Sequence, residues 1–374
     1  NEAEANVTLT SNKSVFSVVL ADDSWLSYTI SGTIVTFKAK SKNTTGNIRT
    51  TIATITAGTG AAAKAVEVTV NQNVAAEGDA SLELSTNTVT ITPDAVAKSE
   101  VITMISDETE FAINITDESW VKAYVDVTSK TLYFWTLSPN LNSSNRVTTA
   151  TVTAGSGANA PKQEVTITQR GLLSSEFAVG QVIADNGSLK GGIVFWVDGT
   201  NRGKAKIMSL DRENLAWSTA DSPASTGVTL SNDNGLANTT AMAALPNAAE
   251  MPALKYCMDK GSGWYWPTRS DLEQMFETYN GTKVADATED NPNAITDFEK
   301  ANRAAWDLIV TNVGGTAMNT AAASSTGDSY WASRETSSGT NAFYVRFGKP
   351  LAWDKANGKK SGARYIRAVR SISK

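Results

Sequence analysis

The sequence predicts a multidomain protein in which two all-β sandwiches are followed by a larger α+β domain. Three observations indicate this order: a repeat in the first half, short alternating Val, Ile and Thr segments in both copies of it, and mixed strand and helix patterns in the second half. The predicted domains are residues 1–75, 78–171 and 176–374. Residues 171–176 are expected to form a short linker between the second sandwich and the α+β domain.

The repeat fixes the number of sandwiches, because each copy is one structural unit. Its copies are offset by 95 residues at a shared tryptophan and by 97 residues at the later motifs. The matching segments are Asp23-Ser24-Trp25 with Glu118-Ser119-Trp120, residues 53–58 with residues 150–155, and residues 68–72 with residues 165–169. The repeat therefore predicts two tandem domains of one family, with two residues inserted in the second copy.

Each copy consists of short segments that alternate between apolar and polar residues. Examples are residues 15–19 and 34–37 in the first copy and residues 111–115 and 132–135 in the second. Gly, Asn and Ser separate these segments, and no helical periodicity appears among them. Such a pattern is typical of a β-sandwich.

The same motifs follow one another in both copies: Ser-Trp, Asn-x-Arg or Asn-Arg, an alternating strand, Gly-x-Gly, and Val-Thr-(Val/Ile)-x-Gln. Over about residues 5–170 this series resembles BACON domains, immunoglobulin-like modules of Bacteroidetes surface proteins. The resemblance implies an immunoglobulin-like fold with carbohydrate binding or a spacer role. Trp25 and Trp120 are expected to fill the two cores, because both take the same place in their copy.

After Phe177 the pattern changes to a mixture of strands and helices. The predicted strands lie near residues 191–197, 204–210, 342–347 and 364–371, and the predicted helices lie near residues 247–259, directly after Thr268, and near residues 297–312. The last of these helices is expected to place Phe298, Ala301, Ala305 and Leu308 against a core. This mixture predicts an α+β domain.

Residues 263–272 have the features of a strand followed directly by a helix. Trp264 and Trp266 lie two residues apart and share one face of the strand, which a proline ends. Thr268 and Asp271 have the spacing of a helix cap. The apolar positions of the helix then recur at helical spacing, at Leu272, Met275, Phe276 and Tyr279.

Further motifs accompany this strand-to-helix stretch along the second half of the chain. They are Gly180-Gln181-Val182-Ile183, Gly191-Gly192-Ile193-Val194-Phe195, Asn238-Thr239, Tyr330-Trp331-Ala332-Ser333 and Arg364-Tyr365-Ile366-Arg367-Ala368-Val369-Arg370. In order and spacing they resemble a bacterial extracellular domain with a C-type-lectin-like fold, a family that includes the Fibrobacter major paralogous domain. The resemblance implies a C-type-lectin-like fold whose ligands lie on the loops near the end of the chain.

Composition excludes several kinds of active site. The chain has no histidine and a single cysteine, Cys257, which removes Ser-His-Asp and Cys-His catalysis, histidine metal sites and an internal disulfide. Cys257 has apolar neighbours and is expected to be buried. The nearest echo of a calcium-dependent sugar motif, Asn291-Pro292-Asn293, lies far from Trp353-Asp354. We therefore predict a protein that is not an enzyme and has no metal or cofactor.

The loops around Trp331 and Trp353 are the predicted ligand contact. Residues 340–374 carry nine Lys or Arg against one Asp, a charge of +8 that leaves −13 on the rest of a chain whose net charge is −5. A basic loop of this kind attracts acidic ligands. The candidate residues are Trp331, Arg334, Trp353, Asp354, Lys355, Lys359 and Arg364. The alternatives are core packing for the tryptophans and a solvated loop for the cations.

The predicted role is adhesion or recognition at an extracellular or outer-membrane surface, with a glycan or a host-surface protein as the partner. Nucleic acid is not expected, since the net charge is negative. No apolar run approaches the roughly 18–20 residues of a membrane span, and the chain is expected to be a mature or trimmed form that meets the membrane only through a possible lipid anchor outside this sequence.

Two alternative roles make different structural predictions. A structural subunit of a pilus or outer-membrane assembly predicts an apolar patch or a strand edge left open for a partner. A glycan-active enzyme predicts two carboxylates that face one another in a deep pocket.

Overall fold

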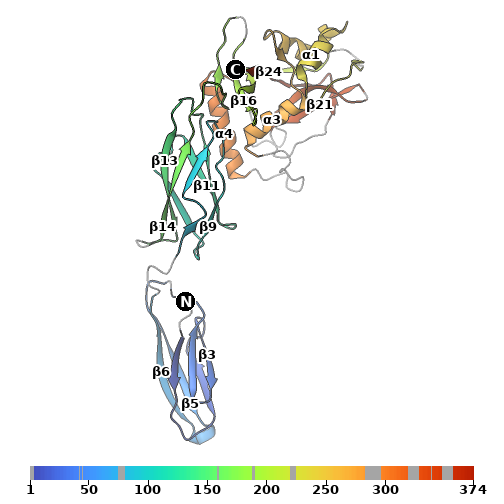
Figure 1. The fold of residues 1–374 in the computed structure, drawn as a ribbon. Coiled ribbons are helices and arrows are strands. Elements are labelled where there is room, and N and C mark those ends of the chain that lie inside the picture. Colours follow the sequence, from blue (N-terminus) through green and yellow to red (C-terminus); the bar gives the residue numbers. More distant parts are fainter. Residues whose placement is uncertain are drawn as a thin grey trace. The chain divides into compact units, whose positions relative to one another are not determined.

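The structure is a computed structural model of the 374-residue chain. It describes all residues except 1–3, 42, 44, 75–80, 158–159, 188–189, 220–224, 283–295, 319–327, 338 and 348–356. The chain forms two compact units, one of Asn1–Ser81 with Ser156–Pro161 and one of Leu82–Gly155 with Lys162–Lys374. Figure 1 labels many of their helices and strands.

The first unit contains a β-sandwich of two three-stranded antiparallel sheets, with the orders β1-β4-β3 and β2-β5-β6 (Figure 1). The strands are β1 Glu4–Thr8, β2 Phe16–Leu20, β3 Leu26–Ser31, β4 Ile34–Ala39, β5 Arg49–Ala57 and β6 Lys64–Gln72, and a short 3-10 helix, η1 Gly60–Ala62, precedes β6. The core consists of Val18, Trp25, Leu26, Val35, Phe37, Ala53 and Ile55. Trp25 is 7% exposed, which confirms its predicted core position.

The second sandwich pairs two four-stranded sheets, with the orders β10-β13-β14-β8 and β11-β12-β9-β7. Its strands are β7 Glu83–Leu84, β8 Thr88–Ile91, β9 Ile102–Ile105, β10 Phe111–Ile115, β11 Val121–Asp126, β12 Thr131–Thr136, β13 Arg146–Ala154 and β14 Lys162–Gln169. Fifteen buried apolar residues form its core, among them Trp120 at 4% exposure. The predicted β-sandwiches are therefore confirmed.

The remainder of the second unit combines two five-stranded sheets, β15-β16-β17-β24-β19 and β18-β23-β20-β21-β22, with several helices. The strands are β15 Val182–Ile183, β16 Gly192–Val197, β17 Lys204–Ser209, β18 Glu213–Ala216, β19 Trp264–Tyr265, β20 Ser329–Glu335, β21 Asn341–Arg346, β22 Asn357–Lys359, β23 Ala363–Ile366 and β24 Val369–Ser373. The helices are α1 Gly235–Ala243, η2 Ala248–Glu250, α2 Pro252–Met258, α3 Arg269–Asn280 and α4 Asp297–Asn312.

Two apolar clusters form the core of this part, and the strands contribute to both. Residues of α1 and α2 belong to the first cluster, and residues of α3 and α4 belong to the second. Along β21, Tyr344 belongs to the first cluster and Val345 to the second, which confirms the predicted alternation. Cys257 is fully buried in the first cluster, as expected, and burial raises the pKa of its thiol.

The predicted strand-to-helix stretch is confirmed. Trp264 and Trp266 are 2% and 0% exposed in the first cluster. Thr268 Oγ1 accepts a hydrogen bond from the Asp271 amide at 3.1 Å, and Asp271 Oδ2 accepts one from the Thr268 amide at 2.9 Å. This reciprocal cap starts α3. The helix ends at Gly281, where φ is +76° and a Cβ atom would lie 2.8 Å from Asn302.

Three other expectations differ from the structure. The helix predicted near residues 247–259 is divided into η2 and α2, because Pro252 lacks an amide N–H and restricts the residue before it. The strand predicted near residues 364–371 is divided into β23 and β24, which belong to different sheets. Helix α1 was not predicted at all, since its sequence has only a weak apolar periodicity.

Helix α4 has two buried faces in place of the single face that was expected. Trp306 and Val310 belong to the second cluster of the C-terminal part, while Phe298 and Ala305 pack against Trp135 of the second sandwich. The prediction for Leu308 is wrong, because its side chain is 59% exposed. The helix therefore joins the second sandwich to the C-terminal part.

Polar contacts strengthen this junction, which we define as the contact between the second sandwich and the C-terminal part. Arg202 forms an ion pair with Asp94 at 2.6 Å, and Arg170 forms one with Glu176 at 2.7 Å. The Ala95 amide donates to the Val179 carbonyl at 2.9 Å. Within the predicted linker, residues 171–176, Glu176 takes part in the junction, whereas residues 173–175 are exposed.

Candidate functional site

Trp331, one of the two tryptophans predicted to meet a ligand, is an internal residue. Its side chain is 0% exposed, and its indole Nε1 donates to the Leu215 carbonyl at 3.1 Å. Its ring packs edge to face with Tyr344, with ring centres 5.8 Å apart. The prediction of ligand contact by Trp331 is wrong, because a ring enclosed by the core offers no face to a ligand.

The other candidate residues have different surroundings. The Arg364 guanidinium lies 3.7 Å from the ring centre of Tyr344 and 4.7 Å from that of Trp331, which is cation–π geometry. Arg334 is half-buried and donates to the Asn232 side chain. Lys359 is exposed on β22. Ligand contact by these three cations stays a prediction.

Trp353, Asp354 and Lys355 lie outside the described residues. The structure therefore brings Arg364 together with Trp331 and does not test the loop on which the predicted site depended.

One cation of the basic C-terminal segment is an internal ion-pair partner. The Lys360 side chain is 1% exposed and its Nζ lies 2.5 Å from Glu335 Oε2. The same carboxylate accepts hydrogen bonds from Ser225 and Thr226. Burial raises the pKa of Glu335, but the ammonium and these donors outweigh it, so that the pKa lies below its usual range. Lys360 therefore adds no free charge to a ligand surface.

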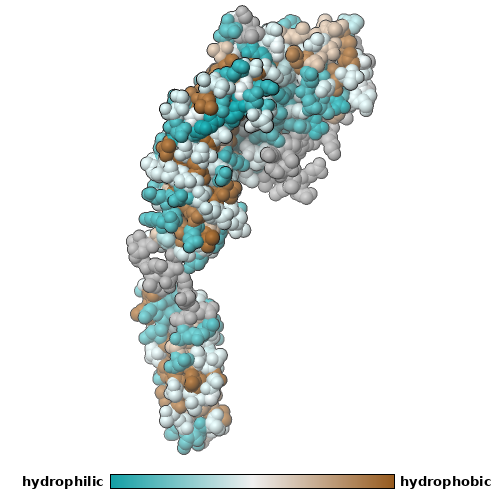
Figure 2. Space-filling model, in the orientation of Figure 1, coloured by the Kyte–Doolittle hydropathy of each residue, from teal (hydrophilic) through white to brown (hydrophobic). Residues whose placement is uncertain are grey.

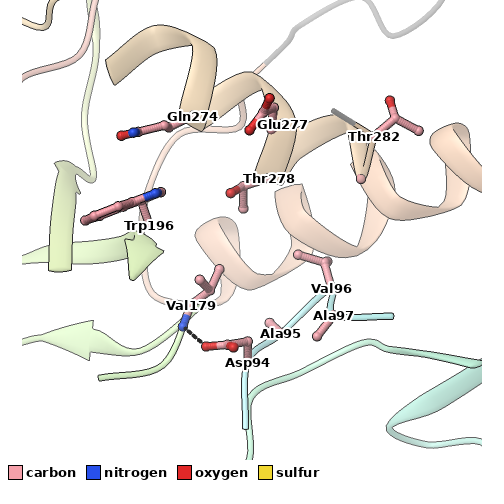
Figure 3. A pocket seen from close by; sticks show the side chains of 11 residues that line it. Asp94, Ala95, Val96, Ala97, Val179, Trp196, Gln274, Glu277, Thr278 and Thr282 are labelled. Atoms are coloured by element: carbon pink, nitrogen blue, oxygen red, sulfur yellow. Dashed lines mark hydrogen bonds between the residues drawn. The ribbon is translucent and has the colours of Figure 1, made fainter. Parts of the chain in front are cut away.

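A pocket lies at the junction, and we call it the junction pocket (Figure 3). Its volume is about 280 Å³, close to the lower limit of roughly 300 Å³ for small-ligand sites. It is lined by Asp94, Ala95, Val96 and Ala97 of the β8–β9 connection, by Val179 and Trp196, by Gln274, Glu277 and Thr278 of α3, and by Gly281 and Thr282. Figure 3 shows the α3 side chains on one side and the Asp94 segment on the other.

Trp196 supplies the aromatic wall of the junction pocket. The pairing of β16 with β17 shifts register between Val194 and Trp196, and bulges of this kind redirect side chains. The preceding Phe195 is 0% exposed in the core, whereas Trp196 is half-buried. Lys206 Nζ lies 5.3 Å from the ring centre of Trp196. The exposed part of the indole is therefore held at one end of the pocket.

Several polar groups around the junction pocket are fixed by hydrogen bonds. Lys206 Nζ donates to Gln274 Oε1 at 2.9 Å, which orients that side-chain amide. The Thr278 hydroxyl donates to the Phe195 carbonyl at 2.7 Å, and the Thr282 hydroxyl donates to Glu299 at 3.2 Å. Both hydroxyls already donate, and the Thr282 oxygen also accepts a hydrogen bond from Asn280 Nδ2, so that only their remaining lone pairs can meet a ligand.

Val96 forms part of the pocket wall in an unusual backbone conformation. Its φ of 50° lies in the left-handed region, which costs a β-branched residue of the order of 1–3 kcal/mol. Hydrogen bonds hold it there: the amides of Val96 and Ala97 donate to the carbonyl and hydroxyl oxygens of Thr136, at 2.9 and 3.0 Å. Strand β12 of the second sandwich thus holds this wall in place.

No local signal in the sequence indicated the junction pocket. Phe195 and Trp196 are adjacent in β16, but the register shift breaks the regular alternation there, and Trp196 packs against the same apolar cluster that contains Phe195. Asp94, on the opposite wall, is about a hundred residues earlier in the chain and reaches the pocket only through the tertiary fold.

Comparison with known proteins gives little further guidance. No family model matches the chain, and no curated protein matches it. Similar solved structures include the human desmocollin-1 ectodomain, with 10% identity, a TM-score of 0.26 and coverage of 52% of this chain and 43% of that one. Mouse cadherin-23 has 14% identity, a TM-score of 0.25, and coverage of 42% of this chain and 54% of that one.

An endo-fucoidan hydrolase from glycoside hydrolase family 107 is also similar, with 10% identity, a TM-score of 0.23, and coverage of 46% of this chain and 27% of that one. The chain spans between about a quarter and just over half of these three proteins. TM-scores of this size carry no argument about fold or activity. The assignment of β-sandwiches rests on the sheets of the chain itself. Within the described residues, no helix is both long and apolar enough to span a bilayer.

Proposed function

We propose that this chain is a non-catalytic recognition protein of the cell surface that binds a glycan in the junction pocket. The observation that carries the proposal is the partly exposed ring of Trp196 beside the fixed polar groups of α3. An aromatic face packs against the apolar face of a sugar ring, while amide and hydroxyl groups meet its hydroxyls. The sandwiches are then BACON-type modules and the C-terminal part a C-type-lectin-like domain, as their motifs imply.

The charges around the junction pocket favour a neutral sugar. Asp94 is paired with Arg202 at 2.6 Å, and Lys206 is paired with Asp271 at 2.6 Å. Charges that are paired within the protein contribute little net potential to a ligand. A neutral glycan therefore fits this pocket better than the acidic ligand expected at the basic C-terminal loop.

The surroundings of Asp94 also favour binding over catalysis. The pocket is lined by two carboxyl groups, Asp94 and Glu277. Asp94 Oδ1 accepts hydrogen bonds from Arg202 at 2.6 Å and from the Val179 amide at 2.8 Å. A carboxylate engaged in this way is poorly suited to move protons to and from a substrate. The proposal places the chain at an extracellular or outer-membrane surface, where such ligands occur.

The proposal is tested by a glycan-array screen of the full chain, followed by calorimetry on the best ligand. We expect Trp196→Ala to weaken binding by about tenfold, the loss of one ring contact. Tyr28→Ala is the matched control, because Tyr28 is an exposed aromatic residue of the first sandwich, at 38% exposure. Its affinity should equal that of the unaltered chain.

Two results would contradict the proposal that a glycan binds in the junction pocket. One is the absence of any glycan ligand on the array. The other is a ligand whose affinity is unchanged in Trp196→Ala and falls in Lys359→Ala, which would move the site to the basic C-terminal segment. Circular dichroism of each variant checks that the sandwiches remain folded.

A structural subunit of a surface assembly is the second candidate function. The observation that favours it is the exposed apolar surface of the first unit, where Val15, Val19, Ile48, Ile52 and Val66 are 41–66% exposed. Figure 2 shows apolar areas on the visible face of the first unit. Exposed apolar groups at a strand-rich surface favour contact with another protein.

A further inference from the structure

A second pocket lies beside helix α1, which Figure 1 labels, and we call it the α1 pocket. Its volume is about 410 Å³, larger than that of the junction pocket and within the range of roughly 300–1,000 Å³ for small-ligand sites. One wall is a single face of α1, and the other is the turn between α2 and β19. The lining residues are Leu236, Thr239, Thr240 and Ala243 of α1, with Met258, Gly261, Ser262 and Trp264.

Apolar side chains of the α1 pocket are in contact with water. Leu236 and Met258, from its two walls, are 47% and 46% exposed. Ala243, which lines the same pocket, is half-buried. Covering such groups with an apolar part of a ligand removes them from water and is favourable. The α1 pocket therefore favours a ligand with at least one apolar group.

The α1 pocket has no charged side chain among the described residues that line it. Arg370 packs on Trp264, with its guanidinium 5.4 Å from the ring centre, but it does not line the pocket. Burial of a charged group without a counter-charge is costly. The expected ligand is therefore uncharged.

Two buried donors of the α1 pocket have no acceptor in the part of the chain that the structure describes. Thr239 is 4% exposed, and its hydroxyl oxygen accepts from the Trp266 amide at 2.9 Å but donates to no described residue. Trp264 is 2% exposed, and its indole Nε1 has no partner there. Buried donors without acceptors are unfavourable, so that a ligand oxygen that accepts from them is stabilised. This pair favours a ligand with a carbonyl oxygen.

Thr240 offers the α1 pocket a group of the opposite kind. Its hydroxyl donates to the Leu236 carbonyl, one helical turn earlier, at 2.9 Å. Because the hydrogen is engaged, the remaining lone pairs of this oxygen can accept from a ligand N–H. The α1 pocket thus combines two donors, one acceptor and exposed apolar groups.

We infer that the α1 pocket binds the acetamido group of an N-acetylated amino sugar. This uncharged group has one carbonyl oxygen, one N–H and one methyl group. The carbonyl accepts from Thr239 and Trp264, the N–H donates to Thr240, and the methyl group covers Leu236. Ser262 is exposed and offers a hydroxyl to the sugar ring. This site shares no residue with the junction pocket and does not depend on ligand binding there.

The test is an NMR titration of the 374-residue chain with N-acetylglucosamine, in which the indole N–H signals of its ten tryptophans are followed. The signals are assigned on the unaltered chain, so that no core variant is needed. We expect the Trp264 signal to move downfield and to saturate with a Kd of roughly 1 mM, because its hydrogen gains an acceptor. Glucose has the same ring without the acetamido group and should leave this signal in place. The Trp196 signal reports separately on the junction pocket.

Two variants with matched controls locate the ligand. Leu236→Ala should weaken binding about fivefold, whereas Leu308→Ala, which removes an exposed leucine from α4, should leave the affinity unchanged. Thr240→Val removes the acceptor and should also weaken binding about fivefold. Thr311→Val is its control, because the Thr311 hydroxyl donates to the Asp307 carbonyl one turn earlier, as that of Thr240 does to its own helix.

Four results would overturn the inference. The first is that neither indole signal moves. The second is an equal movement of the Trp264 signal with glucose, which would mean that the acetamido group is not recognised. The third is equally tight binding of N-acetylalanine amide, which would make the ligand an acetylated amino acid. The fourth is movement of the Trp196 signal alone, which would place the sugar in the junction pocket and support the proposed function instead.

Discussion

The two sandwiches have the same local chemistry but different boundaries. Asn43 Nδ2 donates to the carbonyls of Asn47 and Gln72, and Asn140 Nδ2 donates in the same way to those of Ser144 and Gln169. The second sandwich also has β7 and β8 at its edges and α4 against its outer face. Among the described residues, its core has fifteen buried apolar residues against seven in the first.

This difference shows that repeat motifs determine the arrangement inside a sheet but not how well the sheet is covered. Gln169 Oε1 accepts a hydrogen bond from Arg146 at 2.6 Å, whereas Gln72 Oε1 is buried and has no partner in the described part of the chain. Burial of the matched valines of β6 and β14 differs in the same direction. Stability therefore depends on the neighbours that each sandwich obtains.

The largest expected effect comes from breaking the contact with α4. Phe298 is 4% exposed, and its ring centre lies 5.5 Å from that of Tyr133 and 5.6 Å from that of Trp135. We expect Phe298→Ala to lower the free energy of unfolding of the second unit by about 3–5 kcal/mol. Calorimetry should then show the second sandwich melting apart from the C-terminal part.

Leu308→Ala on the same helix is the matched control. Its side chain is 59% exposed, so that the substitution should change the free energy of unfolding by no more than about 0.5 kcal/mol. Equal melting curves for Phe298→Ala and the unaltered chain would contradict the role given to α4.

A pair of identical substitutions at matched repeat positions sharpens the comparison of the cores. Val165→Ala should lower the free energy of unfolding by about 2 kcal/mol, because the side chain is fully buried and its removal leaves a cavity. Val68→Ala should cost about half of that or less, since Val68 is only partly buried. Urea unfolding of each variant measures both values. Equal losses would mean that β6 is covered as well as β14.

The smallest expected effect concerns acid. Burial raises the pKa of Glu176, but its hydrogen bond and ion pair with Arg170 and the nearby Arg202 outweigh this, so that the pKa lies below the ordinary value of 4.5. The stabilisation that Glu176 gives to the junction is then present above pH 4.5, and it is lost as the pH falls through the lowered pKa. Glu176→Gln should remove this pH dependence from the melting temperature of the second unit. If the melting temperature of the variant fell with pH as much as that of the unaltered chain, the role given to Glu176 would be contradicted.

Features determined by nearby residues could be predicted from the sequence. The cap between Thr268 and Asp271, the alternation along β21 and the burial of Trp25 and Trp120 each depend on residues a few positions apart or on the repeat. Features determined by distant residues could not. No local pattern distinguishes an enclosed tryptophan such as Trp331 from an exposed one.

The same reason explains the two errors at the site and on α4. An amphipathic pattern identifies an apolar face but not its partner, and α4 uses Phe298 against a sandwich while Leu308 faces solvent. Trp331 lies in the core cluster of the C-terminal part, so that core packing was the better interpretation. The junction pocket needs the β8–β9 connection, β16 and α3 together, and no local pattern indicates that these segments meet.

The most direct test of the difference between the sandwiches is native-state hydrogen exchange of the full chain without any ligand. The amides of Thr166 and Thr168 should exchange at least about a hundredfold more slowly than those of Thr69 and Asn71, because in the part of the chain that the structure describes only the first pair faces a neighbouring strand. Equal protection of the two pairs would show that the outer edge of β6 is already covered.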